Sequence, residues 1–347
     1  MRAMTRLSPG LFYAIVVPLL GGAAIAGVII GSTPLSVSRI LHAIAAHLIP
    51  AATADATPIA RADDAIVWLI RMPRVIVAGV VGAGLATAGV MMQSLFRNPL
   101  AEPTLVGVGP GAVLGAVIAF VAGFSGRSVV MLPLMAIASA FIALMLVQAI
   151  AARGARRPTL SLLLTGIAVG TFFTAIASFL LSINIVTWQV AQEIVFWMMG
   201  GLDSRTWAHV WLSGPFVAFG ICAAMLQART LDLFPLGEEK AAALGVDVES
   251  ARRLLLATSA LLTGASIAVA GLVGFVGLVV PHAVRMIVGP RHHVLIPASA
   301  VGGAAFLILC DLAARTVRPP AEIRLGVVTA ICGAPLFLIL LLRRDRA

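Results

Sequence analysis

Two groups of residues have types and spacings that could do chemistry. The first is Arg71-Met72-Pro73-Arg74, where two arginines three residues apart stand at the start of an apolar run. Arginine holds carboxylates through paired hydrogen bonds, so this pair could receive an acidic external partner. The alternative is that each arginine only extends its charged end to a membrane interface, as arginines at helix ends commonly do.

The second group is the segment from Gly274 to Arg285, which places glycines, Pro281, His282 and an arginine inside an apolar run. A lipid-embedded helix interrupted in this way needs protein or water around it to satisfy the freed backbone groups. The segment therefore indicates a cavity or pathway. For His282, helix packing or hydrogen bonding is favoured over metal ligation. Met198 and Met199 could contact a large planar ligand, although soft apolar packing is commoner for such a pair.

Catalytic and energy-coupling motifs are missing from the sequence. It has no Gly-x-x-x-x-Gly-Lys-Ser/Thr phosphate loop and no catalytic or metal-ligand spacing. Asp311 is the main acid in the apolar runs, whereas carriers driven by protons or sodium usually place carboxylates within their helices. We expect no enzyme activity and no permanently bound cofactor or metal, so active transport would need a separate energy-supplying subunit. The cysteines at 222, 310 and 332 are interpreted as small core residues.

The composition is that of a membrane protein. Apolar residues make up 61% of the 347 residues and charged residues 11%, against roughly 45–50% and about 25% in soluble domains; the mean hydropathy is +1.07. Since about 20 residues cross a bilayer, we predict an all-α polytopic membrane protein with ten helices and a single domain over residues 1–347. The apolar runs are 11–30, 72–96, 104–124, 129–152, 160–183, 206–227, 252–271, 278–288, 294–315 and 326–342. The run 278–288 is short and is predicted to be a half-helix.

The distribution of basic residues predicts the topology. With both termini in the cytoplasm, 15 of the 24 lysines and arginines lie on the cytoplasmic side and 9 on the other, as the positive-inside rule requires. The net charge of +10 therefore reflects topology and not a nucleic-acid partner. Residues 31–70 would form a periplasmic connection with an amphipathic helix at 36–47, and residues 229–253 a cytoplasmic loop.

The cytoplasmic loop contains a segment suited to docking. Residues 236–246 predict a short helix closed by Gly245, with Glu238 and Glu239 in its first turn, where acids are favourable. A short, rigid helix of this kind fits a groove on another protein. An ordinary surface helix would have the same pattern.

Several motifs follow one another in a family-specific order: Arg71 to Arg74, Arg97 to Pro103 with Gly107 to Gly111, Trp197 to Gly201, Gly274 to Arg285, and Leu325 to Thr329 with Gly333 to Pro335. From about residue 70 to its end, the chain resembles the permease subunits of ATP-binding-cassette importers for vitamin B12, ferric siderophores and heme. The resemblance implies a ten-helix inner-membrane subunit that forms a homodimer of the type II importer class around one pathway. Its implied partners are a second copy, a periplasmic binding protein and two ATPase subunits that use ATP.

The resemblance also implies roles for individual residues. Docking of the binding protein is assigned to Arg71, Arg74 and Arg315. ATPase coupling is assigned to Leu236, Gly237, Glu238, Glu239, Ala242, Leu244, Gly245 and Val246. The cytoplasmic gate, where the family often has Ser-Thr-Ser, is assigned to Thr159 and Leu160. Pathway positions are Met198, Met199, Gly274, Phe275, Gly277 and Pro281.

We therefore predict a permease subunit that moves an iron chelate from a periplasmic binding protein to the cytoplasm by alternating access. Heme is favoured because Met198, Met199 and the apolar spans offer little to a highly polar siderophore. Ferric siderophores and cobalamin are the alternative ligands. A stand-alone secondary carrier and a structural membrane scaffold are the rival classes.

Overall fold

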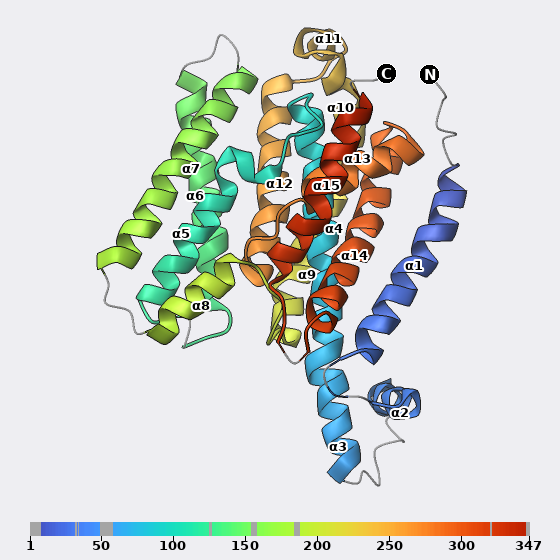
Figure 1. The fold of residues 1–347 in the computed structure, drawn as a ribbon. Coiled ribbons are helices and arrows are strands. Elements are labelled where there is room, and N and C mark those ends of the chain that lie inside the picture. The colour runs from blue at the N-terminus through green and yellow to red at the C-terminus, as the bar shows by residue number, and fades with distance from the viewer. Residues whose placement is uncertain are drawn as a thin grey trace.

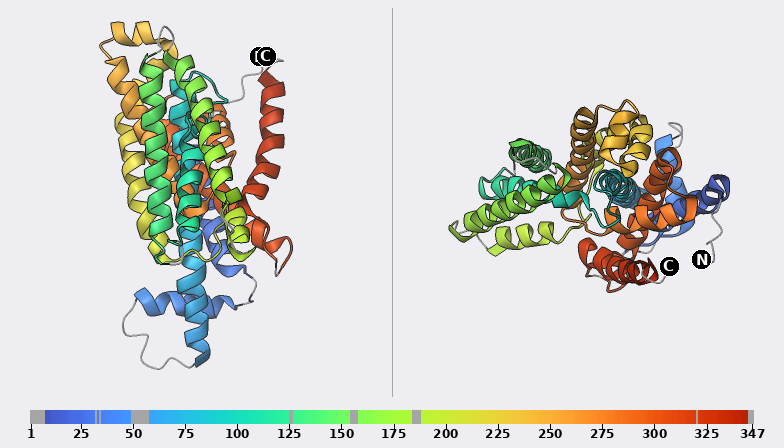
Figure 2. Two further views of the ribbon diagram at one scale, coloured as in Figure 1. Left: turned by 90° about the vertical axis from the view of Figure 1, so that its left-hand side faces the viewer. Right: turned by 90° about the horizontal axis from the view of Figure 1, so that it is seen from above.

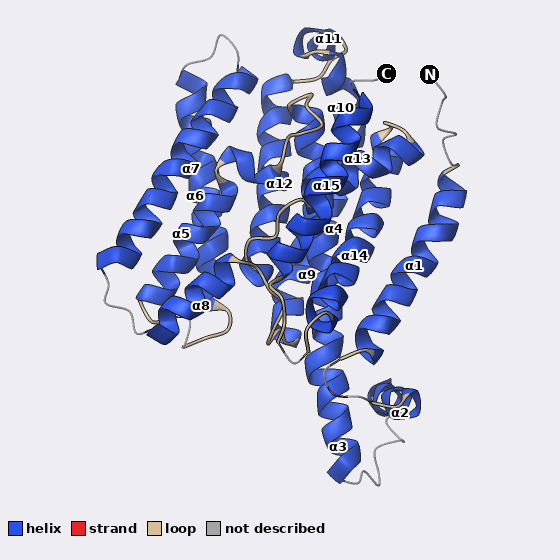
Figure 3. Cartoon of the chain, in the orientation of Figure 1, coloured by secondary structure: helices blue, strands red, loops and turns tan. Residues whose placement is uncertain are grey.

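The computed structural model describes residues 8–31, 33, 35–48, 58–124, 127–153, 158–183, 188–319 and 321–344. Within these ranges all regular secondary structure is helical (Figure 3). Seven helices are long and apolar enough to cross a membrane, and three shorter apolar helices, Val108–Val121, Val276–Val288 and Leu325–Ile339, accompany them. Each of the ten predicted apolar runs forms a helix, so the prediction of an all-α polytopic membrane protein is confirmed.

The helices are arranged so that α11 lies at one end of the bundle and α2 and α3 at the other (Figure 1). We call these the α11 end and the α2 end. In chain order the helices are α1 (Pro9–Ile29), α2 (Val37–Leu48), α3 (Pro58–Asp64), α4 (Met72–Leu95), α5 (Val108–Val121), α6 (Met131–Arg153), α7 (Pro158–Ile183), α8 (Trp188–Met198), α9 (Trp207–Leu226), α10 (Ala228–Leu233), α11 (Glu238–Ala243), α12 (Val248–Ala270), α13 (Val276–Val288), α14 (His292–Thr316) and α15 (Leu325–Arg344).

Helix α4 is the central element and packs against α9, α12, α13 and α14 (Figure 2). Glycines make its closest contacts: a Cβ at Gly82 would overlap the carbonyl of Gly303 in α14, and a Cβ at Gly89 would overlap the backbone of Gly277 in α13. Small residues let helix backbones approach and gain van der Waals contact in a membrane, where apolar burial gives no net drive. The glycines of α4 therefore place α13 and α14 directly against its backbone.

The helix that contains α4 begins earlier than predicted. The sequence placed a polar connection up to residue 70, whereas α3, a π-helical stretch (Ala65–Arg71) and α4 form one continuous helix. Proline inside a helix clashes with the carbonyl four residues before it. The π-helical stretch in front of Pro73, in which the N–H of Met72 donates to the carbonyl of Val67, accommodates this clash by widening the turn.

Of three other short helices, the sequence predicted two. The amphipathic helix expected at 36–47 is α2, and the half-helix expected at 278–288 is α13, which follows a non-helical segment from Gly271 to Phe275. Helix α8 was not predicted. Its Gln189, Gln192 and Glu193 interrupt the apolar pattern, and 11 residues are too few to cross a bilayer.

Candidate functional site

A cavity of about 330 Å³ lies beside the broken segment, between α4, α5, α7, α8, α12 and α13. Its polar lining comes from Glu102, Thr104, Thr174 and Thr263, and Met198 contributes a thioether. The hydroxyl of Thr263 is buried and has no hydrogen-bond partner among the residues that the structure describes. A second hollow, between α7 and the start of α5, shares Thr104, Pro110 and Thr174 with this cavity. The cavity is thus continuous with a surface of α7 that is lined by small and hydroxyl residues.

The wall of this cavity contains a strained residue. Phe275, the N-cap of α13, has a φ of 67°, a left-handed conformation that costs a non-glycine residue on the order of 1–3 kcal/mol. Its N–H donates to the carboxyl of Glu102, and its side chain packs directly on Gly333 of α15. The loop before α5 and helix α15 therefore hold the broken segment from two sides.

Glu102 is a half-buried acid that the sequence did not single out. Burial raises the pKa of its carboxyl, and the hydrogen bonds from the Phe275 N–H and the Thr104 hydroxyl oppose this shift. Because it lies in a connection and not in an apolar run, no intramembrane-charge argument applied to it. The structure places it at the cavity that the broken segment forms.

Backbone hydrogen bonds join three helix ends next to the cavity. The N–H of Gly201, just after α8, donates to the carbonyl of Ala270 at the end of α12 (2.9 Å). At the start of α15, the N–H of Leu325 donates to the carbonyl of Gly200 (3.1 Å), and the N–H of Gly326 donates to the carbonyl of Met199 (3.1 Å). The ends of α8, α12 and α15 are thus connected without any side chain.

The predicted pathway residues divide by position. Met198, Gly274 and Gly277 line the cavity, and Phe275 borders it. The side chain of Met199 is exposed, and only its carbonyl takes part in the hydrogen bonds that join the ends of α8, α12 and α15. Pro281 is buried inside α13.

The three predicted docking arginines come together at the α2 end, but their guanidinium groups are enclosed within the chain. Arg71, Arg74 and Arg315 are 4%, 8% and 7% exposed. Arg71 donates to the carbonyls of Val28, Ile29 and Thr33. Arg315 donates to the carbonyl of Gly27. These bonds fix the end of α1 and the chain after it.

Arg74 makes the strongest set of contacts in this cluster. It donates to Asp311 of α14 at 2.8–3.1 Å and to both carboxylate oxygens of Glu322 at 2.9 Å. Arg315 also lies 3.5 Å from Asp311. The sequence did not reveal these partners, although a lone acid in an apolar helix needs a counter-charge and Asp311 could have been matched to an arginine on that ground.

The predicted coupling segment forms the short helix that the sequence indicated. Helix α11 follows Gly237 (φ 113°) and is closed by Gly245 (φ 87°), and it projects from the bundle (Figure 1). Glu238 is held by Arg252 at 2.8 Å. The apolar side chains of Leu236 and Leu244 are 52% and 61% exposed, Ala242 is also exposed and Val246 is partly buried. Glu239 is exposed as well.

The predicted gate residues Thr159 and Leu160 lie in the first turn of α7. Leu160 is exposed, whereas the side chain of Thr159 lies outside the described part of the chain. Within that part, no group of three or more His, Cys, Asp or Glu side chains could hold a metal ion. The interpretation of all three cysteines as core residues is wrong, because only Cys310 is buried while Cys222 and Cys332 are exposed.

Comparison with known proteins agrees with this architecture. Residues 19–343 match the FecCD transport family. The chain is 44% identical to the cobalamin import system permease protein BtuC of Halobacterium salinarum, over 81% of this chain and 74% of that protein. It is 41% identical to the hemin transport system permease protein HmuU of Yersinia pestis, over 80% and 84%. It is also similar to the solved structure of a protein described as a metal-chelate type ABC transporter in an inward-facing conformation, with a TM-score of 0.83, 31% identity and coverage of 96% and 99%. The chain therefore belongs to the FecCD transport family.

Proposed function

We propose that this permease carries a metal tetrapyrrole, with heme as the first candidate, from a periplasmic binding protein into the cytoplasm of a bacterium. It would work as a homodimer in the inner membrane, by alternating access, with two ATPase subunits supplying the energy. In this arrangement the α11 end and both termini face the cytoplasm, and the α2 end faces the binding protein. The single domain would comprise residues 1–347, with residues 31–70 on the outside and the loop 229–253 on the inside.

The cavity at the broken segment carries the transport proposal. Its wall contains the strained Phe275, and the neighbouring helix ends are joined so that α8, α12 and α15 can respond together. To change the side of the membrane to which the path is open, the interface between these helices must be able to take two discrete arrangements. Met198, Gly274, Phe275, Gly277 and the hollow along α7 would line the path; Met199 and Pro281 are proposed to shape it, and Thr159 with Leu160 to close it at the α11 end.

The ligand is proposed from the lining and from the relatives. A mainly apolar cavity with a thioether suits a planar ring with few polar groups, and the similarity to a hemin permease supports heme. Cobalamin is the second candidate, because the sequence of a cobalamin permease is 44% identical to that of this chain. Ferric siderophores would need more polar contacts than this lining offers.

The docking roles follow from the surfaces at the two ends. The exposed Leu236 and Leu244 support ATPase docking on residues 236–246, because solvent-facing apolar side chains favour a partner. For the binding protein, we propose that an incoming carboxylate replaces Glu322 on Arg74. The side chain of Glu322 is 37% exposed, whereas that of Asp311 is 2% exposed and would stay in place.

Reconstitution tests the proposal. Proteoliposomes with the cognate ATPase and binding protein should take up labelled heme only with ATP, and should take up cobalamin or a ferric siderophore more slowly. Preferential uptake of cobalamin would select the second candidate. Uptake driven by an ion gradient without the ATPase would refute the importer mechanism and favour a secondary carrier.

A further inference from the structure

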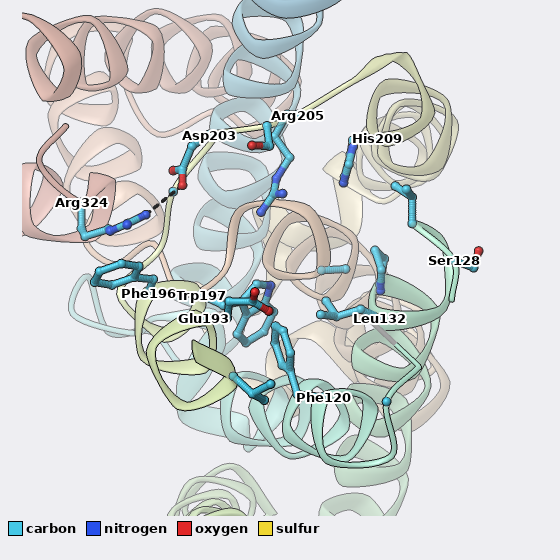
Figure 4. Close-up of a pocket in the computed structure, with 17 residues that line it drawn as sticks. Phe120, Ser128, Leu132, Glu193, Phe196, Trp197, Asp203, Arg205, His209 and Arg324 are labelled. Carbon is cyan, nitrogen blue, oxygen red and sulfur yellow. Dashed lines mark hydrogen bonds and ion pairs between the residues drawn. The ribbon is translucent and has the colours of Figure 1, made fainter. Parts of the chain in front are cut away.

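A larger cavity, of about 740 Å³, lies at the α2 end between α5, α6, α8 and α9, with α12 behind it (Figure 4). Phe120, Leu132 and Trp197 supply its apolar and aromatic wall. Helices α6 and α9 both pack against α12 but make little contact with each other. The cavity therefore lies where the bundle opens sideways between two helices, whose outward faces carry exposed apolar residues such as Leu134 and Trp211.

Unpaired hydrogen-bond donors point into this space. Trp197 is 8% exposed, and its indole N–H has no hydrogen-bond partner in the described part of the chain. The Nε of Arg205 donates to the carbonyl of Val269, while the terminal nitrogens of this guanidinium have no partner among the described residues. In Figure 4 the Arg205 guanidinium and the Trp197 indole approach the same region from opposite sides. A buried donor without a partner, such as the Trp197 N–H, costs about 1–3 kcal/mol, so an acceptor placed between it and the half-buried Arg205 guanidinium would be stabilising.

The charges around Arg205 make an anion the fitting acceptor. Asp203, the acid whose charge acts on Arg205, is paired with Arg324 at 2.9 Å, so it does not neutralise Arg205 by direct contact. Burial lowers the pKa of the Arg205 guanidinium, and the charge on Asp203 opposes that shift. A bound anion would stabilise the charged form of Arg205 and so offset the desolvation cost of burying it.

A carboxylate stands beside the donor pair. Glu193 precedes Trp197 by one turn of α8, lines the same cavity and is exposed. Because like charges repel, an anion alone in this cavity would be disfavoured by Glu193. A ligand with both a phosphate and an ammonium group would satisfy the donors and the carboxylate together.

We propose that this cavity binds one aminophospholipid, with its phosphate on Arg205 and Trp197, its ammonium group on Glu193 and its acyl chains along Leu132 in the opening between α6 and α9. The lateral opening and the apolar wall favour a lipid over a soluble zwitterion, because a headgroup alone would leave this surface uncovered. Tryptophan and arginine at the end of a membrane bundle are also the side chains that meet headgroups. This cavity and the one beside the broken segment have no lining residue in common, so the inference stands without the proposed ligand.

Native mass spectrometry of the full-length permease tests the proposal. Protein purified from bilayers of phosphatidylethanolamine, phosphatidylcholine and phosphatidylglycerol should retain one phosphatidylethanolamine per chain in preference to the other two. Arg205→Gln should weaken this retention about tenfold or more, the effect of one hydrogen bond to a charged group. Arg127→Gln is the control, because Arg127 is exposed at the same end and lies over Phe124.

Two conservative variants separate the lipid site from a folding effect. Trp197→Phe keeps the ring but removes the donor and should reduce retention. Glu193→Gln changes an exposed side chain and should abolish the preference for phosphatidylethanolamine over phosphatidylglycerol, with an unchanged unfolding temperature. The proposal is overturned if wild-type protein shows no headgroup preference, if Arg205→Gln and Arg127→Gln behave alike, or if soluble phosphoethanolamine displaces the lipid at equal concentration.

Discussion

Replacing Asp311 with asparagine should destabilise the protein far more than the same change at an exposed ion pair. Asp311 is 1% exposed and accepts three hydrogen bonds from Arg74 at 2.8–3.1 Å. In the variant, Glu322 alone balances Arg74 and Arg315, so one buried positive charge is left uncompensated, which costs about 3–5 kcal/mol. The matched control is Asp203→Asn: Asp203 pairs with Arg324 at 2.9 Å but its side chain is 51% exposed, and such pairs contribute about 0–1 kcal/mol.

Equilibrium unfolding in mixed detergent micelles at pH 7, followed by tryptophan fluorescence, measures both variants. The double variant Asp311→Asn with Arg74→Gln should lose less than the sum of the single losses, because neither residue then leaves the other unpaired. Similar losses for Asp311→Asn and Asp203→Asn would refute the reasoning. So would additivity in the double variant to within about 0.5 kcal/mol.

Three further predictions concern the two ends of the bundle and the cavity. Glu322→Gln should raise affinity for the binding protein, up to about fivefold for an exposed pair, in surface plasmon resonance on nanodiscs. Leu236→Ser with Leu244→Ser should weaken ATPase association at least about tenfold, because a buried leucine contributes about 1.5–3 kcal/mol; pull-down across a concentration series measures this. Burial raises the pKa of Glu102, so the protonated form is favoured in the folded state. The contribution of Glu102 to stability should therefore be greatest below the ordinary glutamate pKa of about 4.3 and should decline as the pH rises through the raised value, whereas Glu102→Gln, which keeps an acceptor for Phe275, should remove that part of the pH dependence.

Each of these tests has an outcome that contradicts it. Unchanged affinity after Glu322→Gln would mean that Glu322 does not compete for the binding protein's site. Leu41 on α2 is as exposed as Leu244, at 61%, so an equal loss of ATPase association in Leu41→Ser would point to general destabilisation. Identical pH profiles of unfolding temperature for wild type and Glu102→Gln would exclude Glu102 as the titrating group.

Local sequence patterns predicted the helices of the fold. They could not predict the side-chain contacts at the candidate sites, because those contacts join residues that are far apart in the chain. The apolar runs and the closure of α11 by Gly245 depend on residues that are close in sequence. In contrast, Arg74 is 237 residues from Asp311 and 248 from Glu322, so no spacing argument could pair them. The unpartnered Trp197 N–H is another such case, because only packing decides whether a donor finds an acceptor.

The backbone hydrogen bonds that join α8, α12 and α15, here called the joint, determine which mutations this part of the protein tolerates. Its hydrogen bonds run between main-chain atoms of residues 199–201, 270 and 325–326. Replacing the side chain of Met199, Ala270 or Leu325 therefore leaves the bonds intact, apart from proline at position 325, which removes a donor. The glycines behave differently, because a Cβ at Gly200 or Gly326 would lie 2.4 Å from a neighbouring carbonyl oxygen. The part of this permease that links its helix ends is thus insensitive to the identity of most side chains and sensitive to changes at its glycines and in its backbone.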